Sequence, residues 1–292
     1  MTPGTNAACW SMHLSTVYAA EPRWFEQTVA AIRAGTHPVR AAADTPDAET
    51  LSGPMYRLQA GVAVIPVVGA ITKGFSKFGG ASAAFTRRAV RAAVSDPDVG
   101  AILLKIDSPG GSVAGIDDLA ADVARAASVK PTEAYIEDVG ASAAYWIASE
   151  ANAIHSNPSA MVGSIGAFMV LIDSSKAAEI AGLRVLPVAS GPLKAAGQPG
   201  TPITDAVLAE TQALVDAVAS RFFAAVKRGR QMSKAQLDAV TTGGVWPASE
   251  AKALGLLDSV RPIDEVVAAL SAKAARKMRP RAAAAALPDL GS

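Results

Sequence analysis

The sequence predicts an α/β fold that is built on a mostly parallel sheet. Half of the 292 residues are hydrophobic and only 5% are aromatic, a balance that suits close packing of helices on a sheet. Strand-like and helix-like segments alternate between residues 61 and 150, as they do where crossovers connect parallel strands. Glycine-rich turns follow the strand-like segments, where α/β folds place their functional sites.

The alternating region contains three segments of each kind. We expect strands over residues 61–72, 99–106 and 134–136, and helices over residues 82–93, 113–127 and 141–150. Pro66 should interrupt the first strand, because proline removes a ladder hydrogen bond. Further helices are predicted over residues 203–230, 233–240 and 264–275.

The segment 203–230 carries an apolar stripe at helical spacing. Its members are Val207, Leu214, Val218, Phe222 and Val226. The pattern suits a helix packed within the chain and a helix packed between subunits equally well. Ser233 is the expected N-cap of the next helix.

Three parts are expected along the chain: an N-terminal segment (1–55), a central domain (56–265) and a basic, alanine-rich tail (266–292). Spacing of apolar residues around Trp24 indicates a helix over residues 22–34, and a linker follows. This N-terminal part is either packed on the main domain or a docking or self-inhibitory arm. The tail is expected to be solvated and disordered.

Bulk composition excludes several classes of protein. The net charge of +1 gives no reason to expect specific nucleic-acid binding, and the single cysteine, Cys9, excludes an intrachain disulfide and a cysteine-based metal site. No metal or other cofactor is expected. The first 20 residues do not resemble a signal peptide, and no apolar run approaches the roughly 20 residues of a membrane span. We therefore expect a soluble, cytoplasmic protein.

Ser142 is the first candidate functional residue. It follows a glycine and precedes an apolar run of small residues, a setting that leaves a nucleophile accessible and places a backbone N–H beside it. Serine among alanines is, however, more often a residue that allows helices to pack closely. Taken alone, this segment therefore favours packing.

The turn at Ser108-Pro-Gly-Gly111 is the second candidate. Adjacent glycines let the backbone approach a ligand closely. A phosphate-binding loop is a weaker interpretation, because no Gly-Lys-Ser/Thr pattern follows. An N–H of Gly110 or Gly111, together with that of Ala143, would form an oxyanion hole.

A serine nucleophile also needs a base. His13 and His37 lie in the N-terminal segment, and His155 is expected to be a packed core residue. A buried lysine can serve instead, because desolvation favours its neutral form. Lys194, which lies in a loop of small residues, is the preferred candidate, and Lys105 ranks lower because strand alternation allows a position at a sheet edge for it.

Five motifs occur in an order that is similar to one known family. They are Ile106-Asp-Ser-Pro-Gly-Gly-Ser112, Gly140-Ala-Ser-Ala-Ala-Tyr-Trp146, Val162-Gly-Ser-Ile-Gly166, Ser190-Gly-Pro-Leu-Lys194, and the segment Gly243 to Asp258. The chain resembles the signal peptide peptidase A (protease IV) family of serine proteases, which includes the head-maturation proteases of tailed phages. The resemblance covers roughly residues 62–260.

The resemblance implies a role for each matching residue. Ser142 would be the nucleophile, Lys194 the general base, Ser164 the residue that orients the lysine amine, Gly111 and Ala143 the oxyanion-hole donors, and Gly110 the residue that shapes the turn. It also implies a Clp-protease/crotonase-type fold with repeated ββα units, and a Ser-Lys protease domain over residues 56–265. The chain departs from the family in having Ala143 and Ala144 after the nucleophile, and Leu193 in place of an aromatic residue before the lysine.

The expected function is therefore that of a serine endopeptidase with a Ser-Lys dyad. The phage branch would make scaffold, portal or capsid proteins the substrates during head maturation, with a homo-oligomeric enzyme in the host cytoplasm or inside a procapsid. A soluble host peptidase of the same family is the alternative. Two further classes stay open: a crotonase-like acyl-CoA enzyme and an inactive structural shell protein.

Overall fold

The computed structural model describes residues 17–20, 26–27, 30, 34, 55–76 and 79–285. The helix and linker expected over 22–34 and 37–55 fall almost wholly outside these residues. The chain forms two compact units, which are described separately. Unit 1 comprises residues 1–18 and 167–220, and unit 2 comprises residues 19–166 and 221–292.

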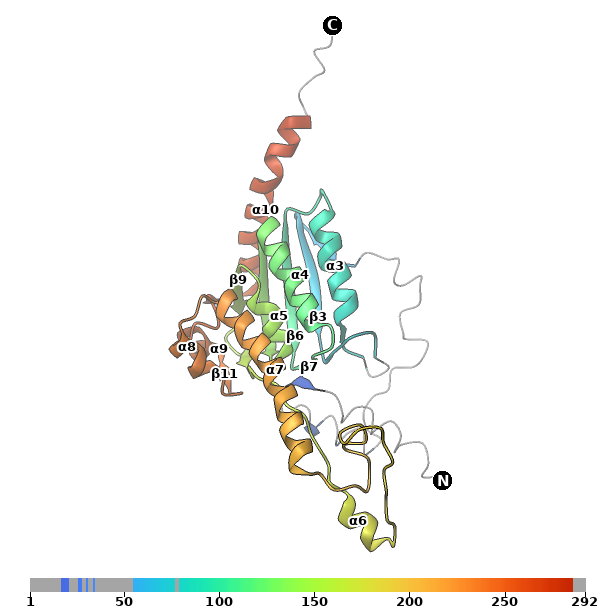
Figure 1. Ribbon diagram of the computed structural model, residues 1–292. Coiled ribbons are helices and arrows are strands. Elements are labelled where there is room, and N and C mark those ends of the chain that lie inside the picture. Colours follow the sequence, from blue (N-terminus) through green and yellow to red (C-terminus); the bar gives the residue numbers. More distant parts are fainter. Residues whose placement is uncertain are drawn as a thin grey trace. The chain divides into compact units, whose positions relative to one another are not determined.

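Unit 2 is built on an eight-stranded sheet (Figure 1). Its strands are β2 (Arg57–Gln59), β3 (Val62–Val68), β6 (Ala101–Ser108), β8 (Thr132–Ala141), β9 (Ala153–Ser156), β10 (Met161–Gly163), β11 (Val245–Pro247) and β12 (Ser259–Val260). The pairs among β3, β6, β8, β9, β10 and β12 are parallel, whereas β2 and β11 pair antiparallel with β3 and β10. The predicted mostly parallel sheet is confirmed.

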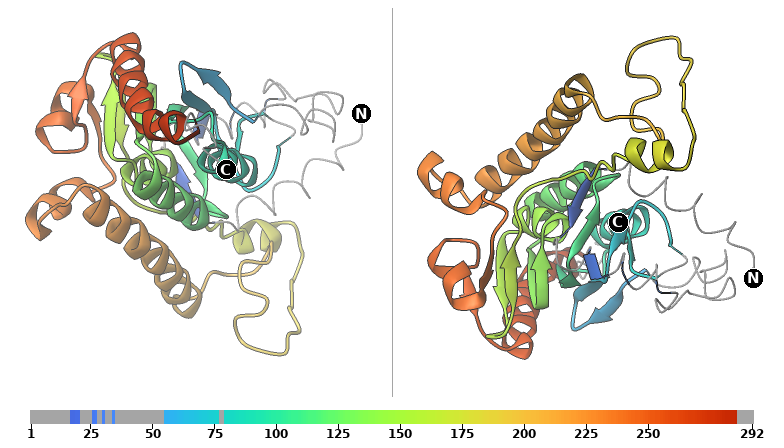
Figure 2. Two further views of the ribbon diagram at one scale, coloured as in Figure 1. Left: turned by 90° about the horizontal axis from the view of Figure 1, so that it is seen from above. Right: turned by 90° about the horizontal axis from the view of Figure 1, so that it is seen from below.

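Helices cover both faces of this sheet (Figure 2). One face carries α3 (Ala83–Ser95), α4 (Ile116–Val129) and α5 (Ala143–Ser149), and the other carries α10 (Ile263–Ala285). On β6, Leu103 packs in the cluster that contains Leu270 of α10, while its neighbours Ile102 and Leu104 are equally buried. Because successive strand residues point to opposite faces, a central strand covered on both sides is apolar throughout.

A smaller sheet lies beside the large one and has the order β1-β7-β4-β5. Its strands are β1 (Tyr18–Ala20), β4 (Ile71–Thr72), β5 (Ala81–Ser82) and β7 (Gly110–Ser112). The Gly110–Gly111 segment, expected to be a turn, is thus also a short strand. It pairs in parallel with β4 through Ile71 and Gly111.

The structure differs from two expectations about strands. Pro66 does not interrupt β3, which pairs continuously with β6 from Val62 to Val68. On its other side β3 is paired with β2 only from Val62 to Val64, so Pro66 stands where that neighbouring strand has ended, and proline is tolerated at such edges. The strand predicted over residues 134–136 is the ten-residue β8.

The C-terminal helices largely follow the prediction. They are α7 (Asp205–Gly229), α8 (Lys234–Val240) and the short α9 (Ala248–Ala253), before α10. Ser233 caps α8 through a capping box, as predicted. Leu214 is half-exposed rather than buried. The helix expected over residues 264–275 is present as part of α10, which continues to Ala285 within the segment named as the tail. None of the helices in the described part of the chain combines the length and the apolar character that a membrane span requires.

Unit 1 contains α6 (Ser175–Ile180) and most of α7. Tyr18 and Phe168 exchange two backbone hydrogen bonds of 2.9 Å within it. Asp173 accepts hydrogen bonds from the backbone N–H groups of Ser175 and Ile203, which ties the start of α6 to the segment before α7. Much of the unit exposes apolar side chains, and Val188 is fully exposed.

Candidate active site

Ser142 lies in the sharp turn between the end of β8 and the start of α5. Its backbone has φ 55° and ψ −121°, a conformation that costs a residue other than glycine about 1–3 kcal/mol. The side chain is buried, and its Oγ has no hydrogen-bond partner among the described residues. A strained strand-to-helix turn that leaves a serine hydroxyl uncommitted is suited to nucleophilic attack.

Gly110 brings a second piece of backbone to this turn. It has φ 91°, and a Cβ placed on it would lie 2.9 Å from Ala143 N and 3.0 Å from Ala141 O. Ala143 is the first residue of α5, so its N–H lacks an acceptor within the helix. The backbone of Gly110, and with it the start of β7 that continues into Gly111, therefore approaches the amide that follows Ser142. An oxyanion hole requires such a meeting of backbone segments.

Ser164 follows the strand that pairs with β8. Gly163 of β10 lies opposite Ala141 of β8, so Ser142 and Ser164 each follow a paired residue. The Ser142 N–H donates to Gly163 O at 2.7 Å, and the Ser164 N–H donates to Gly244 O at 2.6 Å. Ser164 is buried and also has a positive φ, 50°. Within unit 2, the structure thus brings both predicted serines to adjoining turns.

The helix behind Ser142 is held firmly in place. All seven residues of α5 are buried, and the ring of Trp146 stacks on that of Phe222 at a centroid distance of 4.8 Å. Glu150, at the end of the helix, pairs with Arg228 of α7. Burial raises the pKa of the Glu150 carboxyl, although the Arg228 guanidinium opposes that shift. These contacts make α5 a rigid support for the serine turn.

Two residues of the Gly-Gly motif stabilise the turn but had no predicted role. The Ser108 hydroxyl donates to Gly69 O at 2.6 Å and accepts from the Gly110 N–H at 3.2 Å. Asp107 accepts a hydrogen bond from the Val139 N–H at 3.2 Å, close to where the register between β6 and β8 shifts. The sequence could have indicated their role, because these two polar residues lie between an apolar strand and two adjacent glycines.

The predicted base, Lys194, lies in unit 1. Its side chain is exposed, and its backbone N–H donates to Gly191 O at 3.1 Å in a turn. Unit 1 by itself does not bury the Lys194 side chain, so the role of Lys194 as a desolvated base stays a prediction. Ser142, Ser164, Gly110, Gly111 and Ala143 all belong to unit 2, so the site assembled above consists of unit 2 residues.

The rival lysine, Lys105, does not lie at a sheet edge, a position that strand alternation alone had allowed. It lies on β6, which is flanked by β3 and β8. Its Nζ is 3.1 Å from Glu137 Oε1, in a pair of partly exposed side chains. Lys105 therefore belongs to an ion pair across two strands rather than to the serine turn.

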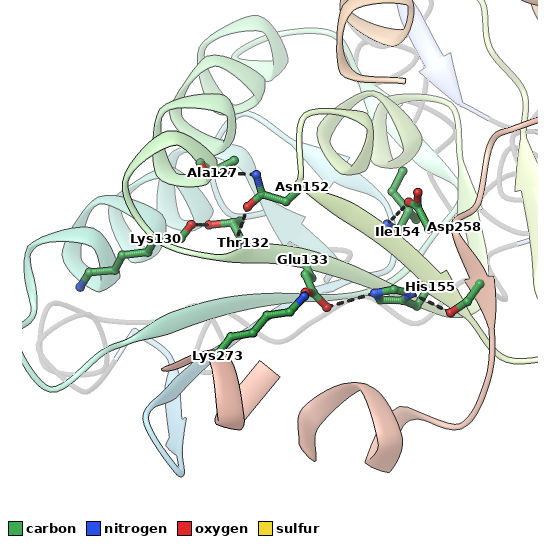
Figure 3. A network of polar contacts seen from close by, with 10 residues as sticks. Ala127, Lys130, Thr132, Glu133, Asn152, Ile154, His155, Asp258 and Lys273 are labelled. Carbon is green, nitrogen blue, oxygen red and sulfur yellow. Dashed lines mark hydrogen bonds and ion pairs between the residues drawn. The ribbon is translucent and has the colours of Figure 1, made fainter. Parts of the chain in front are cut away.

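The prediction that His155 is a packed residue is confirmed by its exposure of only 5%. Its Nε2 lies 3.0 Å from Glu133 Oε2 and its Nδ1 lies 2.8 Å from Ser259 Oγ, while Lys273 of α10 reaches the other oxygen of Glu133 (Figure 3). This network joins β8, β9, β12 and α10. Within the described ranges, no group of three or more His, Cys, Asp or Glu residues is placed to hold a metal ion.

Solved structures that resemble the chain are distant matches. An enoyl-CoA hydratase/isomerase family protein from Silicibacter pomeroyi has a TM-score of 0.48 and 16% identity, with 77% of this chain and 83% of that chain covered. A ClpP1 variant from Listeria monocytogenes has a TM-score of 0.45 and 13% identity, with 68% of this chain and 90% of that chain covered.

Relatives by sequence are closer. Protease 4 of Salmonella typhi is 34% identical over 71% of this chain and 34% of its own length. Capsid assembly protease C of Escherichia phage lambda is 32% identical over 77% of this chain and 52% of its own length. Head-tail preconnector protein GP5 of Enterobacteria phage P21 is 29% identical over 74% of this chain and 44% of its own length. The matched part of the chain thus spans between a third and about half of the length of these relatives.

The family model of peptidase family S49 matches residues 124–277, which is more than half of the chain. The match includes the two serine turns and the loop of Lys194, and the protease names of the relatives agree with it. The chain therefore belongs to peptidase family S49.

Proposed function

We propose that the chain is a serine endopeptidase in which Ser142 is the nucleophile and Lys194 the general base. One observation carries the proposal: Ser142 combines a strained strand-to-helix turn and an unpartnered, buried Oγ with the close approach of Gly110 to Ala143 N. Membership of a peptidase family supports the reaction class. The catalytic residues fall within 56–265, the segment proposed as the protease domain.

The mechanism is acyl transfer. Lys194 takes the Ser142 proton as the hydroxyl attacks a peptide carbonyl, and the N–H groups of Gly111 and Ala143 stabilise the oxyanion. Lys194 then donates its proton to the leaving amine, and a water molecule hydrolyses the ester. Ser164 orients the lysine amine. Serine–lysine pairs are a recognised variant of the serine–histidine arrangement.

The exposure of Lys194 sets a condition on this mechanism. A lysine acts as a base when burial destabilises its charged form. Lys194 must therefore lose its exposure when the reaction takes place.

The dyad is tested by comparing Ser142→Ala, Lys194→Ala and the control Lys105→Ala in the hydrolysis of unfolded casein. The first two variants should lose at least about 1,000-fold in kcat, as members of a catalytic unit do. Lys105→Ala should retain wild-type activity, because Lys105 pairs with Glu137. Wild-type cleavage by Ser142→Ala or by Lys194→Ala would contradict the assignment.

For the biological role, we place the chain in the phage branch. The lambda capsid assembly protease and the P21 preconnector protein support this placement, at 32% and 29% identity. Scaffold, portal or capsid proteins are then the substrates, and the enzyme works as a homo-oligomer in the host cytoplasm or a procapsid. A host peptidase is the alternative that Protease 4 supports. Portal and major capsid genes beside this gene would decide for the phage role, and their absence would favour the host role.

A further inference from the structure

The N-terminal strand β1 occupies a place beside the candidate site. In the small sheet β1 is the neighbour of β7, the strand that begins at Gly110. Ala19 and Ala20 are 1% and 3% exposed. Residues more than 100 positions before Ser142 are thus buried against the strand that carries the proposed oxyanion donor.

The carbonyl oxygen of Ala19 approaches the same spot as the amide of Ala143. A Cβ placed on Gly110 would lie 2.3 Å from Ala19 O and 2.9 Å from Ala143 N. Both groups therefore lie within a few ångströms of one another around the Gly110 backbone. In the proposed mechanism, the carbonyl oxygen of a scissile peptide bond has to lie there to receive N–H donors.

The backbone of β1 is engaged as the backbone of a bound peptide would be. Extended peptides bind by adding a strand to a sheet edge, with main-chain hydrogen bonds supplying affinity. β1 adds such a strand beside β7, and within unit 1 Tyr18 exchanges two hydrogen bonds with Phe168. Ala19 and Ala20 are small enough to fit against the close-packed backbone of Gly110.

We propose that β1 occupies the strand position of a peptide substrate, and that the enzyme cleaves its own Ala19–Ala20 bond. The inference rests on the proposed function, since it needs Ser142 as a nucleophile. Before cleavage β1 excludes other peptides from this position. Cleavage therefore converts a blocked enzyme into an active one. Because Ala19 precedes the scissile bond, we expect the site to accept peptides that have alanine at this position.

The reaction balances as a single peptide hydrolysis. Ser142 Oγ bonds to the carbonyl carbon of Ala19, and its proton passes through Lys194 to the nitrogen of Ala20 as the C–N bond breaks. Water then hydrolyses the ester, which restores Ser142 and leaves a carboxylate on Ala19. The products are residues 1–19 and a chain that begins at Ala20.

The first test measures the intact mass and N-terminal sequence of the purified full chain over time, beside Ser142→Ala. The wild type should yield a product that begins at Ala20, at a rate independent of protein concentration, while Ser142→Ala stays intact. A wild-type chain that cleaves casein through Ser142 but keeps its Ala19–Ala20 bond would overturn the inference alone. A rate that rises in proportion to concentration would also overturn it. If Ser142→Ala matches the wild type against casein, or neither cleaves it, the proposed function fails as well.

The second test changes the strand itself. Ala19 is only 1% exposed, so Ala19→Arg has no room for its side chain, and self-cleavage at this bond should slow by about 100-fold, as misplaced reacting groups do. A fluorophosphonate probe should label Ser142 faster in this variant than in uncleaved wild type, because β1 no longer covers the position. Ala19→Gly keeps a small residue and should still be cleaved. Ala84→Arg, on an exposed position of α3, is the control for the added charge. Self-cleavage of Ala19→Arg at the wild-type rate would contradict the inference.

Discussion

The backbone N–H of Ser142 donates a hydrogen bond of 2.7 Å to the carbonyl oxygen of Gly163. This bond joins the ends of two parallel strands, and each strand is followed by a serine with positive φ. Such conformations persist only where the surroundings over-determine them. The turn at Ser142 therefore depends on the backbone at Gly163.

Gly163→Ala should disturb both serine turns. Gly163 has φ 129°, and a Cβ on it would lie 2.6 Å from both Gly244 O and the Trp246 ring. We expect a loss of about 1–3 kcal/mol in the free energy of unfolding, together with a fall in kcat that exceeds any change in KM. Urea unfolding and steady-state kinetics on casein measure the two effects.

Gly166→Ala is the matched control for this prediction. No atom lies within 4 Å of a Cβ placed on Gly166, and its φ is not in the left-handed region. Its stability should stay within about 0.5 kcal/mol of the wild type, as for most surface substitutions. Equal losses in the two alanine variants would show that the crowding at Gly163 is not the cause.

Local signals in the sequence predicted local structure well. The helix expected over residues 82–93 is α3, which Ser82 caps by accepting a hydrogen bond from the Phe85 N–H at 3.2 Å, and the predicted cap Ser233 forms a capping box with Gln236. Both interactions span three residues, so residue type and spacing determine them.

The errors concern interactions between distant segments. Whether Pro66 interrupts a strand depends on where β2 ends, and whether Lys105 lies at an edge depends on which strands flank β6. Neither can be read from the residues around them. The approach of Ala19 to Gly110 joins positions about 90 apart, and small residues carry no pattern that would predict such a pairing.

Phe222→Ala should destabilise the support of the serine turn. Phe222 is fully buried, and its ring lies nearly parallel to that of Trp146, with an interplanar angle of 5°. Removing the ring leaves a cavity behind α5, which costs about 3–5 kcal/mol. Urea unfolding measures the loss. Leu214→Ala on the same helix is the control, because Leu214 is 50% exposed and should lose no more than about 0.5 kcal/mol.

Glu133 makes the stability of unit 2 dependent on pH. Burial alone would raise the pKa of the Glu133 carboxyl, but hydrogen bonds from His155 and Lys273 outweigh it and lower that pKa below its ordinary value. The folded state then binds fewer protons than the unfolded state. The stabilisation is therefore complete above the unfolded pKa of about 4.3 and is lost as the pH falls through the folded value.

Glu133→Gln removes this dependence. At pH 7 the variant should be less stable than wild type by about 1–3 kcal/mol, and the difference should shrink below about pH 4. Urea unfolding at a series of pH values gives the comparison. Glu137→Gln is the control, because its partly exposed pair with Lys105 contributes about 0–1 kcal/mol. A difference at Glu133 that stays constant with pH would contradict the argument.

Ser108→Ala tests whether the hydrogen bonds that support the Gly-Gly turn also matter for catalysis. The Ser108 hydroxyl donates to Gly69 O at 2.6 Å and accepts from the Gly110 N–H, so alanine removes a hydrogen-bond partner from both backbone groups. The free energy of unfolding should fall by about 1–3 kcal/mol. Because Gly110 lies against Ala143 N, a shift of the turn by about 1 Å should also lower kcat by about 100-fold.

Ser112→Ala, which removes only a 3.3 Å contact with the Ala114 N–H, should leave kcat and stability unchanged. If Ser108→Ala lost stability while kcat stayed at the wild-type value, the Gly110 turn would not be part of the oxyanion hole.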